Sequence, residues 1–280
     1  SHQVNTSSPI QVGSLSNWSK VACGYHHTVA IKTDNTLWTW GLNSYGQLGS
    51  SNLTHRSSPV QVGSLSNWNE VAAGHSHTVA INSNGTLWTW GNNVYGQLGL
   101  SNTTSMYSPT QVGLLSNWSQ VAQGKYNTAA IKTDGTLWTC GYNNNGQLGN
   151  NSTTSIYSPI QVGNLSNWSK ISCGNFYTLS IKTNGTLWTW GSNGFGQLGL
   201  SNTTARSSPV QVGNLSNWSQ VSGGSYHTAA IKTDGTLWTC GYNSFGQLGL
   251  SNVANRSSPV QVGNLSNWSQ VANEIGRAHV

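Results

Sequence analysis

The sequence contains few charged residues. They occupy only 6% of its 280 positions, against roughly 25% in an ordinary soluble domain. The net charge of +6 comes from 11 Lys or Arg and 5 Asp or Glu, which are scattered along the chain and form no basic stripe. Nucleic-acid-binding surfaces need clustered cations, so we expect no nucleic-acid partner. No apolar run approaches the roughly 18 residues of a membrane span, and none is predicted.

Cysteines and carboxylates are also scarce, and their positions argue against a metal site or catalysis. The four cysteines have neither metal-ligand nor disulfide spacing, so we expect free, mostly buried thiols and no metal or cofactor. Asp34, Asp134 and Asp234 fall in expected turns, where they favour the turn conformation. Besides these the chain has only Glu70 and Glu274. No carboxylate pair or triad converges, and the protein is predicted not to be an enzyme.

The chain does contain a repeat of fifty residues. Residues 36–49 include Thr-Leu-Trp-Thr-Trp-Gly and Tyr-Gly-Gln-Leu-Gly, and related runs return at 86–99, 136–149, 186–199 and 236–249. A fixed period of 20–50 residues is typical of repeat proteins, in which each unit buries its apolar face against its neighbours. We therefore expect one repeat domain in which the repeated tryptophans form the core between units.

Each repeat has the pattern of four short strands. In the second repeat we expect strands at 77–81, 86–90, 109–112 and 118–122. Asn84-Gly85 between the first two favours a two-residue type I′ hairpin turn, and Pro109 would open the third strand, where a missing N–H is tolerated. Four antiparallel strands with no helical period predict an all-β fold built from β-propeller blades.

These residues carry a family resemblance. The runs Gly-x-x-His-Thr-x-Ala-Ile, Leu-Trp-x-Trp-Gly-x-Asn-x-x-Gly-Gln-Leu-Gly and Ser-Pro-x-Gln-Val resemble the regulator of chromosome condensation repeat over residues 1–273. The resemblance implies a seven-bladed β-propeller in which the first strand of each blade lines the central axis. The low charge and closely similar repeats suggest a microbial member that is extracellular or on the cell surface.

The resemblance also sets the expected domain organisation. We place a half blade at 1–23 and full blades at 25–73, 75–123, 125–173, 175–223 and 225–273. About five and a half blades cannot close a seven-bladed ring, so we expect an open ring and a fragment of a protein that is monomeric at full length. Residues 274–280 depart from the repeat and are a suspected non-native tail.

Comparison of the repeats with one another predicts two unlike faces. In a four-stranded meander successive connections alternate between the two ends of the strands, so segments 25–27 and 42–45 should share one face. These segments vary from repeat to repeat, whereas the other face is nearly constant, as in Leu-Ser-Asn-Trp at both 65–68 and 215–218. The variable segments are rich in aromatic, His and Asn side chains, which combine contact area with adaptable hydrogen bonding.

We therefore predict that the variable face binds a protein or a glycan, although neutral drift of exposed loops would give the same pattern. The candidate contact residues are Tyr25, His26, His27, Tyr45, His75, His77, Tyr95, Lys125, Tyr126, Tyr142, Phe176, Tyr177, Phe195, Tyr226, His227, Tyr242 and Phe245. Three of the histidines share one repeat position with Asn127 and Tyr177, and structural hydrogen bonding is expected of them rather than metal binding.

The resemblance leaves two alternative functions open. The family includes a nuclear guanine-nucleotide exchange factor and bacterial propellers that inhibit β-lactamases. Exchange in this family relies on acidic and loop elements in particular blades, whereas every unit here has fifty residues and no insertion. Exchange on a small GTPase and enzyme inhibition are therefore kept as alternatives to a binding scaffold.

Overall fold

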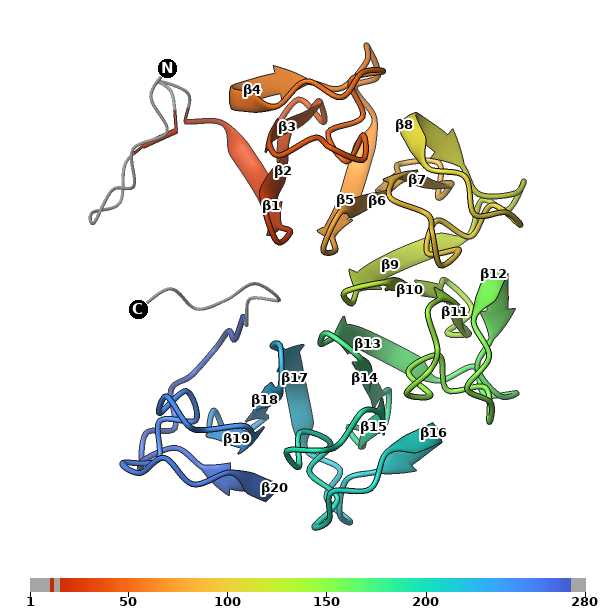
Figure 1. Cartoon of the computed structure of the whole chain (residues 1–280). Helices are drawn as coiled ribbons and strands as arrows, with labels where there is room; N and C mark the ends of the chain where they lie inside the picture. Colours follow the sequence, from red (N-terminus) through yellow and green to blue (C-terminus); the bar gives the residue numbers. More distant parts are fainter. Residues whose placement is uncertain (1–10, 13–15, 273–280) are drawn as a thin grey trace.

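The protein is an all-β molecule. The computed structural model describes residues 11–12 and 16–272. The described residues form five sheets of four antiparallel strands, and they include no helix, hence none that could span a membrane. Figure 1 shows the sheets in chain order around a common centre, with the first and the fifth at the two ends of the arc. The predicted class, an open ring of propeller blades, is confirmed.

The five sheets repeat the same four strands. In the first sheet these are β1 (Trp18–Cys23), β2 (His27–Lys32), β3 (Leu37–Gly41) and β4 (Arg56–Gln61). The second sheet comprises β5 (Trp68–Ala73), β6 (His77–Asn82), β7 (Leu87–Gly91) and β8 (Met106–Gln111). The third comprises β9 (Trp118–Gln123), β10 (Asn127–Lys132), β11 (Leu137–Gly141) and β12 (Ile156–Gln161). The fourth comprises β13 (Trp168–Cys173), β14 (Tyr177–Lys182), β15 (Leu187–Gly191) and β16 (Arg206–Gln211). The fifth comprises β17 (Trp218–Gly223), β18 (His227–Lys232), β19 (Leu237–Gly241) and β20 (Arg256–Gln261).

The boundary between blades lies one strand away from the predicted position. Strand β5, which the sequence analysis placed at the end of the 25–73 blade, pairs with β6 and begins the second sheet. Strand β1 likewise belongs to the first complete sheet and not to an earlier half blade. The fifty-residue period leaves the starting point of a unit open. The connection lengths decide it, because residues 24–26 can only close a hairpin while residues 62–67 pass to the next sheet.

The corrected blades run from 18 to 61 and at fifty-residue steps thereafter. Their innermost strands are therefore β1, β5, β9, β13 and β17, as Figure 1 shows, and not the strands that follow them. The predicted strand after 261 is absent, since residues 268–272 are not in a strand. The suspected tail at 274–280 and most of the first fifteen residues lie outside the described part of the chain, and a seven-bladed ring stays a prediction.

Two local predictions are also corrected. Strand β8 starts at Met106, so Pro109 lies within it. The proline is tolerated there because β8 is an outer edge strand and needs no partner on its free side. In the turn after β6 only Gly85 has a positive φ, of 73°, and its N–H donates to the Asn82 carbonyl at 2.9 Å. A type I′ turn would need positive φ at both central residues, so this is a longer loop with glycine at its end.

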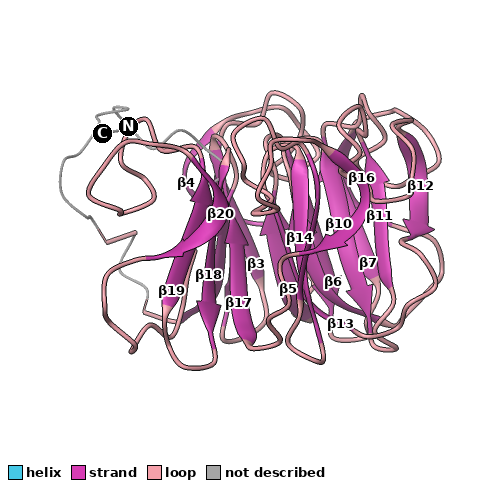
Figure 2. Cartoon of the chain, turned by 90° about the horizontal axis from the view of Figure 1, so that it is seen from below, coloured by secondary structure: helices cyan, strands magenta, loops and turns pink. Residues whose placement is uncertain are grey.

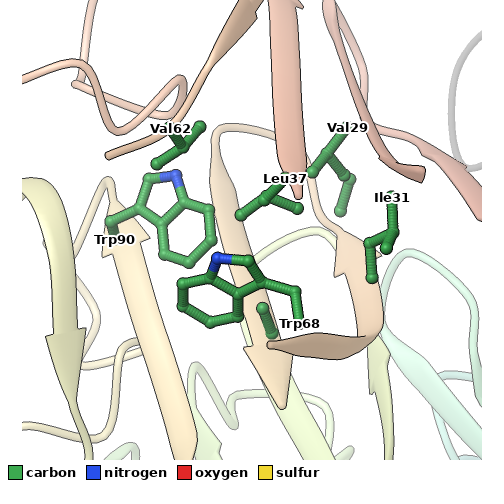
Figure 3. Packing of buried hydrophobic residues seen from close by; sticks show 8 residues of the cluster. Val29, Ile31, Leu37, Val62, Trp68 and Trp90 are labelled. Carbon is green, nitrogen blue, oxygen red and sulfur yellow. The ribbon is translucent and has the colours of Figure 1, made fainter. Parts of the chain in front are cut away.

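The hydrophobic core lies between neighbouring sheets. Figure 3 shows Val29, Ile31 and Leu37 of the first sheet packed against Trp68 and Trp90 of the second. The tryptophan that opens each sheet after the first is almost fully buried, which confirms its predicted core role. The tryptophans at 38, 88, 138, 188 and 238 are only half-buried. In four repeats the ring of this tryptophan contacts a lysine ammonium. The Lys132 Nζ, for example, lies 3.8 Å from the centroid of the Trp138 ring.

The cysteines mostly follow the predicted pattern. Cys140, Cys173 and Cys240 form no disulfide and are buried in the cores between sheets, whereas Cys23 is exposed on the first strand. Burial raises the pKa of each of the three buried thiols to about 12, so they remain protonated and unreactive at neutral pH.

Candidate binding face

The variable segments lie together at one end of the strands, which we call the loop face. It consists of the connections 24–26 and 42–55 and their equivalents in the other sheets. The two connections are hydrogen-bonded to each other, since the Leu42 N–H donates to the His26 carbonyl at 2.8 Å. The predicted sharing of one face is therefore confirmed. The connections 33–36 and 62–67 and their equivalents form the opposite end, called the turn face; Figure 2 shows the strands running between the two.

Each long loop of the loop face is shaped by one buried asparagine. In the first sheet the Asn43 side-chain carbonyl accepts a hydrogen bond from the Leu48 N–H at 2.9 Å. Its amide donates to the carbonyls of Asn52 and Thr54 at 2.8 and 3.2 Å. Asn93, Asn143, Asn193 and Asn243 are likewise almost fully buried and make the same bond to a leucine N–H. The loop is therefore held internally, and the variable side chains at positions such as 42 and 45 project from a fixed frame.

A glutamine in the same loop ties each sheet to the next. The Gln47 main-chain carbonyl accepts hydrogen bonds from the Thr78 hydroxyl at 2.9 Å and from the Trp90 indole at 3.0 Å, both in the second sheet. Its side-chain carbonyl accepts from the Tyr45 N–H. The sequence analysis did not assign these asparagines and glutamines a role, although the constant Asn-x-x-Gly-Gln-Leu-Gly run carried the signal.

Two junctions between sheets carry the same three-ring arrangement. Between the second and third sheets, Tyr95 lies 5.0 Å from Tyr126 and 4.9 Å from Tyr142, measured between ring centroids. One hundred residues later, between the fourth and fifth sheets, Phe195 lies 5.3 Å from Tyr226 and 4.9 Å from Tyr242. Such contacts are each worth about 0.5–1.5 kcal/mol beyond area burial. The rings therefore restrain one another and face solvent as rigid units.

The first triad belongs to a larger cluster that also carries positive charge. The Tyr25 ring stacks on His75 with centroids 4.4 Å apart, and His75 contacts Tyr126 at 5.7 Å. The Lys125 Nζ lies 5.2 Å from the Tyr126 ring and 5.5 Å from the Phe176 ring, distances at which a cation is attracted to the ring face. We call this group the cationic cluster; its members are Tyr25, His26, His75, Tyr95, Lys125, Tyr126, Tyr142 and Phe176.

A second group on the same face has no charge. Phe195, Tyr226 and Tyr242 are joined by Phe245, which contacts Tyr242 at 6.0 Å, and we call these four residues the neutral cluster. Phe245 is 79% exposed, so this cluster presents bare aromatic surface to solvent. Tyr45, the remaining predicted aromatic contact residue, is exposed on the loop of the first sheet.

Three of the predicted contact residues are wrong, because they are buried. His27, His77 and Tyr177 start the second strand of their sheets and point into the junction with the next sheet, where they are at most 3% exposed. The His27 Nε2 lies 3.0 Å from the Thr78 hydroxyl of the next sheet. Tyr177 donates its hydroxyl hydrogen to the carbonyl of His227, which is half-buried in the same kind of junction. Hydrogen bonding within the structure, the other expectation for these positions, is confirmed.

Burial has an electrostatic consequence for the two junction histidines. It lowers the pKa of His27 and of His77 to about 3, with smaller contributions from the neighbouring histidines. Both imidazoles are therefore neutral at any physiological pH. They fill space and make hydrogen bonds between sheets, but they carry no charge toward a ligand.

The described carboxylates all lie away from the loop face. Asp34, Asp134 and Asp234 sit in the turn face, where each accepts hydrogen bonds from the threonine two residues later. Glu70 forms an ion pair with Lys20 between the first two sheets. The predicted turn-forming role of the aspartates is confirmed. Apart from Lys20 and Glu70, no acid and base among the described residues form an ion pair.

Comparison with family models matches almost the entire chain. The model described as "Regulator of chromosome condensation (RCC1) repeat" matches residues 1–31, 34–81, 84–131, 134–181, 184–231 and 234–278. A second model of the same repeat matches 18–47, 68–97, 118–147, 168–197 and 218–247. Each repeat of the chain therefore matches the family model separately.

Solved structures are similar to the chain in fold, and one relative is similar over a short stretch of sequence. The structure of human WBSCR16 is similar with a TM-score of 0.83 and 23% identity, covering 92% of this chain and 70% of that one. Prp20p of Saccharomyces cerevisiae is similar with a TM-score of 0.80 and 22% identity, covering 91% and 67%. The E3 ubiquitin-protein ligase highwire of Drosophila melanogaster is 48% identical over 44 residues, which are 16% of this chain and 1% of highwire. Below 25% identity the structural likeness shows the fold alone.

Proposed function

Because the chain belongs to the regulator of chromosome condensation (RCC1) repeat family, we propose that it is a non-enzymatic propeller scaffold that binds a protein partner through its loop face. One observation carries this proposal: the side chains that differ between repeats include many aromatic residues and are gathered on a face whose backbone is constant and internally hydrogen-bonded. A fixed frame with interchangeable contact residues is how recognition surfaces are commonly built.

The chemistry of the face favours a protein over other ligands. Protein interfaces are enriched in aromatic residues, and the strongest contributions come from Tyr, Trp and Arg in well-packed surroundings. Rings that already contact one another, such as Tyr95 and Tyr126, lose little side-chain freedom on binding, which lowers the cost of association. Two solved structures with a similar fold concern protein binding. In one, Kap60 is bound to yeast RCC1 (Prp20). The other reports the binding properties of Prp20p to Gsp1p and histones.

Guanine-nucleotide exchange on a small GTPase is the second candidate. The fold likeness to Prp20p, which binds Gsp1p, favours it. The absence of any described carboxylate from the loop face counts against it, since exchange in this family was expected to need acidic elements. A nucleotide-release assay on a panel of small GTPases separates the two functions, because a binding scaffold would leave the release rate unchanged.

The binding function can be tested with two matched double variants. Tyr126→Ala with Tyr226→Ala removes a ring from each cluster on the loop face. Leu65→Ala with Leu215→Ala removes two side chains that are about half exposed on the turn face. Labelled protein is applied to an array that carries both proteins and glycans, with near-UV circular dichroism to confirm that each variant folds.

We expect the tyrosine variant to lose the protein signals of the natural sequence and the leucine variant to keep them. Equal signals from the two variants would contradict a binding role for the loop face. Signals confined to glycan spots would show a glycan-binding protein instead.

A further inference from the structure

The two clusters of the loop face differ in charge. At one repeat position the residues are Tyr25, His75, Lys125, Asn175 and Ser225, so at this position the lysine and the imidazole lie in the second and third sheets, and the fourth and fifth sheets carry uncharged residues. His26 adds a further imidazole from the first sheet. The sheets follow one another around the arc, so the cationic cluster and the neutral cluster occupy different sectors of the same face.

No described acid balances the positive sector. Around His75 lie the stacked Tyr25 ring, the Ser76 hydroxyl 2.9 Å from its Nδ1, and Tyr126. The charged or titratable neighbours that act on it are Lys125 and His26, and His75 in turn acts on the buried His27 and His77. Burial, then Lys125, then His26 lower the pKa of His75. No described carboxylate lies beside this imidazole, whereas the Lys125 ammonium does, so the sector can accommodate an anion.

The lysine of this sector, Lys125, is positioned by aromatic rings. Its ammonium lies over the Tyr126 and Phe176 rings and has no hydrogen-bond partner among the described residues, while the Lys125 main-chain N–H donates to the Asn175 carbonyl. An ammonium that rests on aromatic rings keeps its three hydrogen-bond donors available for a ligand. The neutral sector offers a different environment, because Phe245 and Phe195 expose apolar ring surface and, among the described residues, no lysine or arginine is stacked on the rings of this cluster.

We propose that the loop face recognises an acidic segment of its partner in one direction, with carboxylates on the Lys125, His75 and His26 side of the cationic cluster, in the first three sheets, and apolar side chains on the neutral cluster of the last two. This inference rests on the proposed protein-binding function and adds the chemistry and the polarity of the partner. Charge complementarity of this kind sets orientation and association rate more than total affinity.

The test uses a defined peptide probe. A fluorescein-labelled peptide carries six glutamates, a flexible Gly-Ser spacer and two tryptophans; a control peptide carries glutamines in place of the glutamates. Binding is measured by fluorescence anisotropy at low and physiological salt. We expect the glutamate peptide to bind about tenfold more tightly than the control at low salt, and the preference to shrink as salt screens the charges.

Matched variants separate charge from contact area. Lys125→Gln should remove about fivefold of the preference for the glutamate peptide and leave the control peptide unchanged. Lys170→Gln makes the same change of charge on an exposed innermost-strand residue away from the loop face, and should alter neither. Phe245→Ser should weaken both peptides to the same extent, because its contact carries no charge.

The pH dependence gives an independent readout. A carboxylate beside His75 favours the charged imidazole, so binding takes up a proton and strengthens as the pH falls from 7.5 to 5.5, where glutamates remain ionised. His75→Asn should abolish most of this dependence. A photo-crosslinker at the glutamate end should attach to residues 74–76 and 124–126.

The outcomes distinguish this inference from the proposed function. Attachment of the glutamate end to residues 192–195 or 242–245 would overturn the polarity. A protein partner from the array that binds with no dependence on Lys125, salt or pH would overturn the acidic segment while leaving the binding function intact. Absence of any loop-face binding by peptides and array proteins would overturn both.

Discussion

The turn face and the loop face close the same strands, yet one is constant and the other is not. In the turn face, the backbone of the neighbouring sheet approaches closely: a Cβ at Gly185 would lie 2.2 Å from the Ser216 carbonyl oxygen. In the loop face, a Cβ at Gly194 would meet nothing within 4 Å. The other repeats carry Ser, Val, Asn and Ser at the Gly194 position. The residue type can therefore vary at positions where the side chain extends into solvent, as at Gly194. It is restricted at positions where the backbones of two neighbouring sheets come close together, as at Gly185.

Main-chain hydrogen bonds sharpen the same comparison. On the turn face the Trp68 N–H donates to the Asn35 carbonyl at 3.1 Å, and the same bond links each later sheet to the one before it. On the loop face the links between sheets are made by the constant glutamines and by further main-chain bonds, such as those from the Ser51 N–H to the Tyr107 carbonyl at 2.9 Å and from the Lys125 N–H to the Asn175 carbonyl at 3.1 Å. The main-chain bonds do not depend on which side chain a contact position carries, so the binding surface can change without loss of the ring.

The largest effect is expected from the core that the turn face covers. Trp168→Ala removes a ring that is 3% exposed and packs against Trp188 and Trp190. It should lower the free energy of unfolding by about 3–5 kcal/mol. Phe245→Ala on the loop face should change it by less than about 0.5 kcal/mol. Urea denaturation followed by circular dichroism measures both, and similar losses for the two variants would remove the distinction between scaffold and recognition residues.

Acidification should weaken the junctions that contain histidine. His27 and His77 have folded pKa values of about 3 and unfolded values near 6.5. The unfolded chain therefore binds more protons below pH 6.5, and stability is complete above that pH and falls as the pH drops toward 3. At pH 5 each histidine should cost about 2 kcal/mol relative to pH 7.5.

The control for this prediction comes from the chain itself. Asn127 occupies the same junction position in the third sheet, so His27→Asn with His77→Asn should still fold. This double variant should lose most of the difference in unfolding free energy between pH 7.5 and pH 5, measured by denaturation at the two values. An unchanged pH dependence would mean that other groups cause it.

Glycine substitutions directly compare a position where the backbone of the next sheet is close with a position where the space around the glycine is open. Gly185→Val should lower the free energy of unfolding by about 1–3 kcal/mol, because φ is 76° and the added side chain meets the next sheet. Gly194→Val should have almost no effect, since Val94 already occupies that position. Gly185→Asn should cost less than Gly185→Val, because Asn35 adopts a φ of 61° in the equivalent turn. Thermal unfolding ranks the three, and a reversed order would contradict the steric explanation.

Among the variants expected to destabilise the fold, those in the two aromatic triads should have the smallest effect. Tyr95→Ala and Phe195→Ala each remove the ring that contacts two others, at nearly the same distances in both triads. Each should lower the free energy of unfolding by about 1 kcal/mol. The two losses should agree, since the geometry repeats. A much larger loss at one triad, measured by the same denaturation assay, would show that it also supports the fold.

Sequence reasoning succeeded where periodicity is strong and failed where burial depends on neighbours. The strands, the aspartate turns and the gathering of variable segments on one face follow from alternation and turn residues that any four-stranded meander must obey. Tyr177 and Tyr126 are one residue position apart in the repeat and look alike in sequence, yet one is sealed in a junction and the other lies at the surface. No local pattern separates them, because the neighbouring sheet does so.

The amino-acid sequence by itself determined the fifty-residue repeat, the all-β units and the concentration of aromatic residues in two segments, since these depend only on which residues follow one another. The tertiary structure alone decided where one blade ends, which rings meet across junctions, and that the Lys125 ammonium lies over the Tyr126 and Phe176 rings. Those features arise between sheets, where residues fifty or more positions apart come into contact. They depend on how neighbouring units pack, which the order of residues within one unit does not specify.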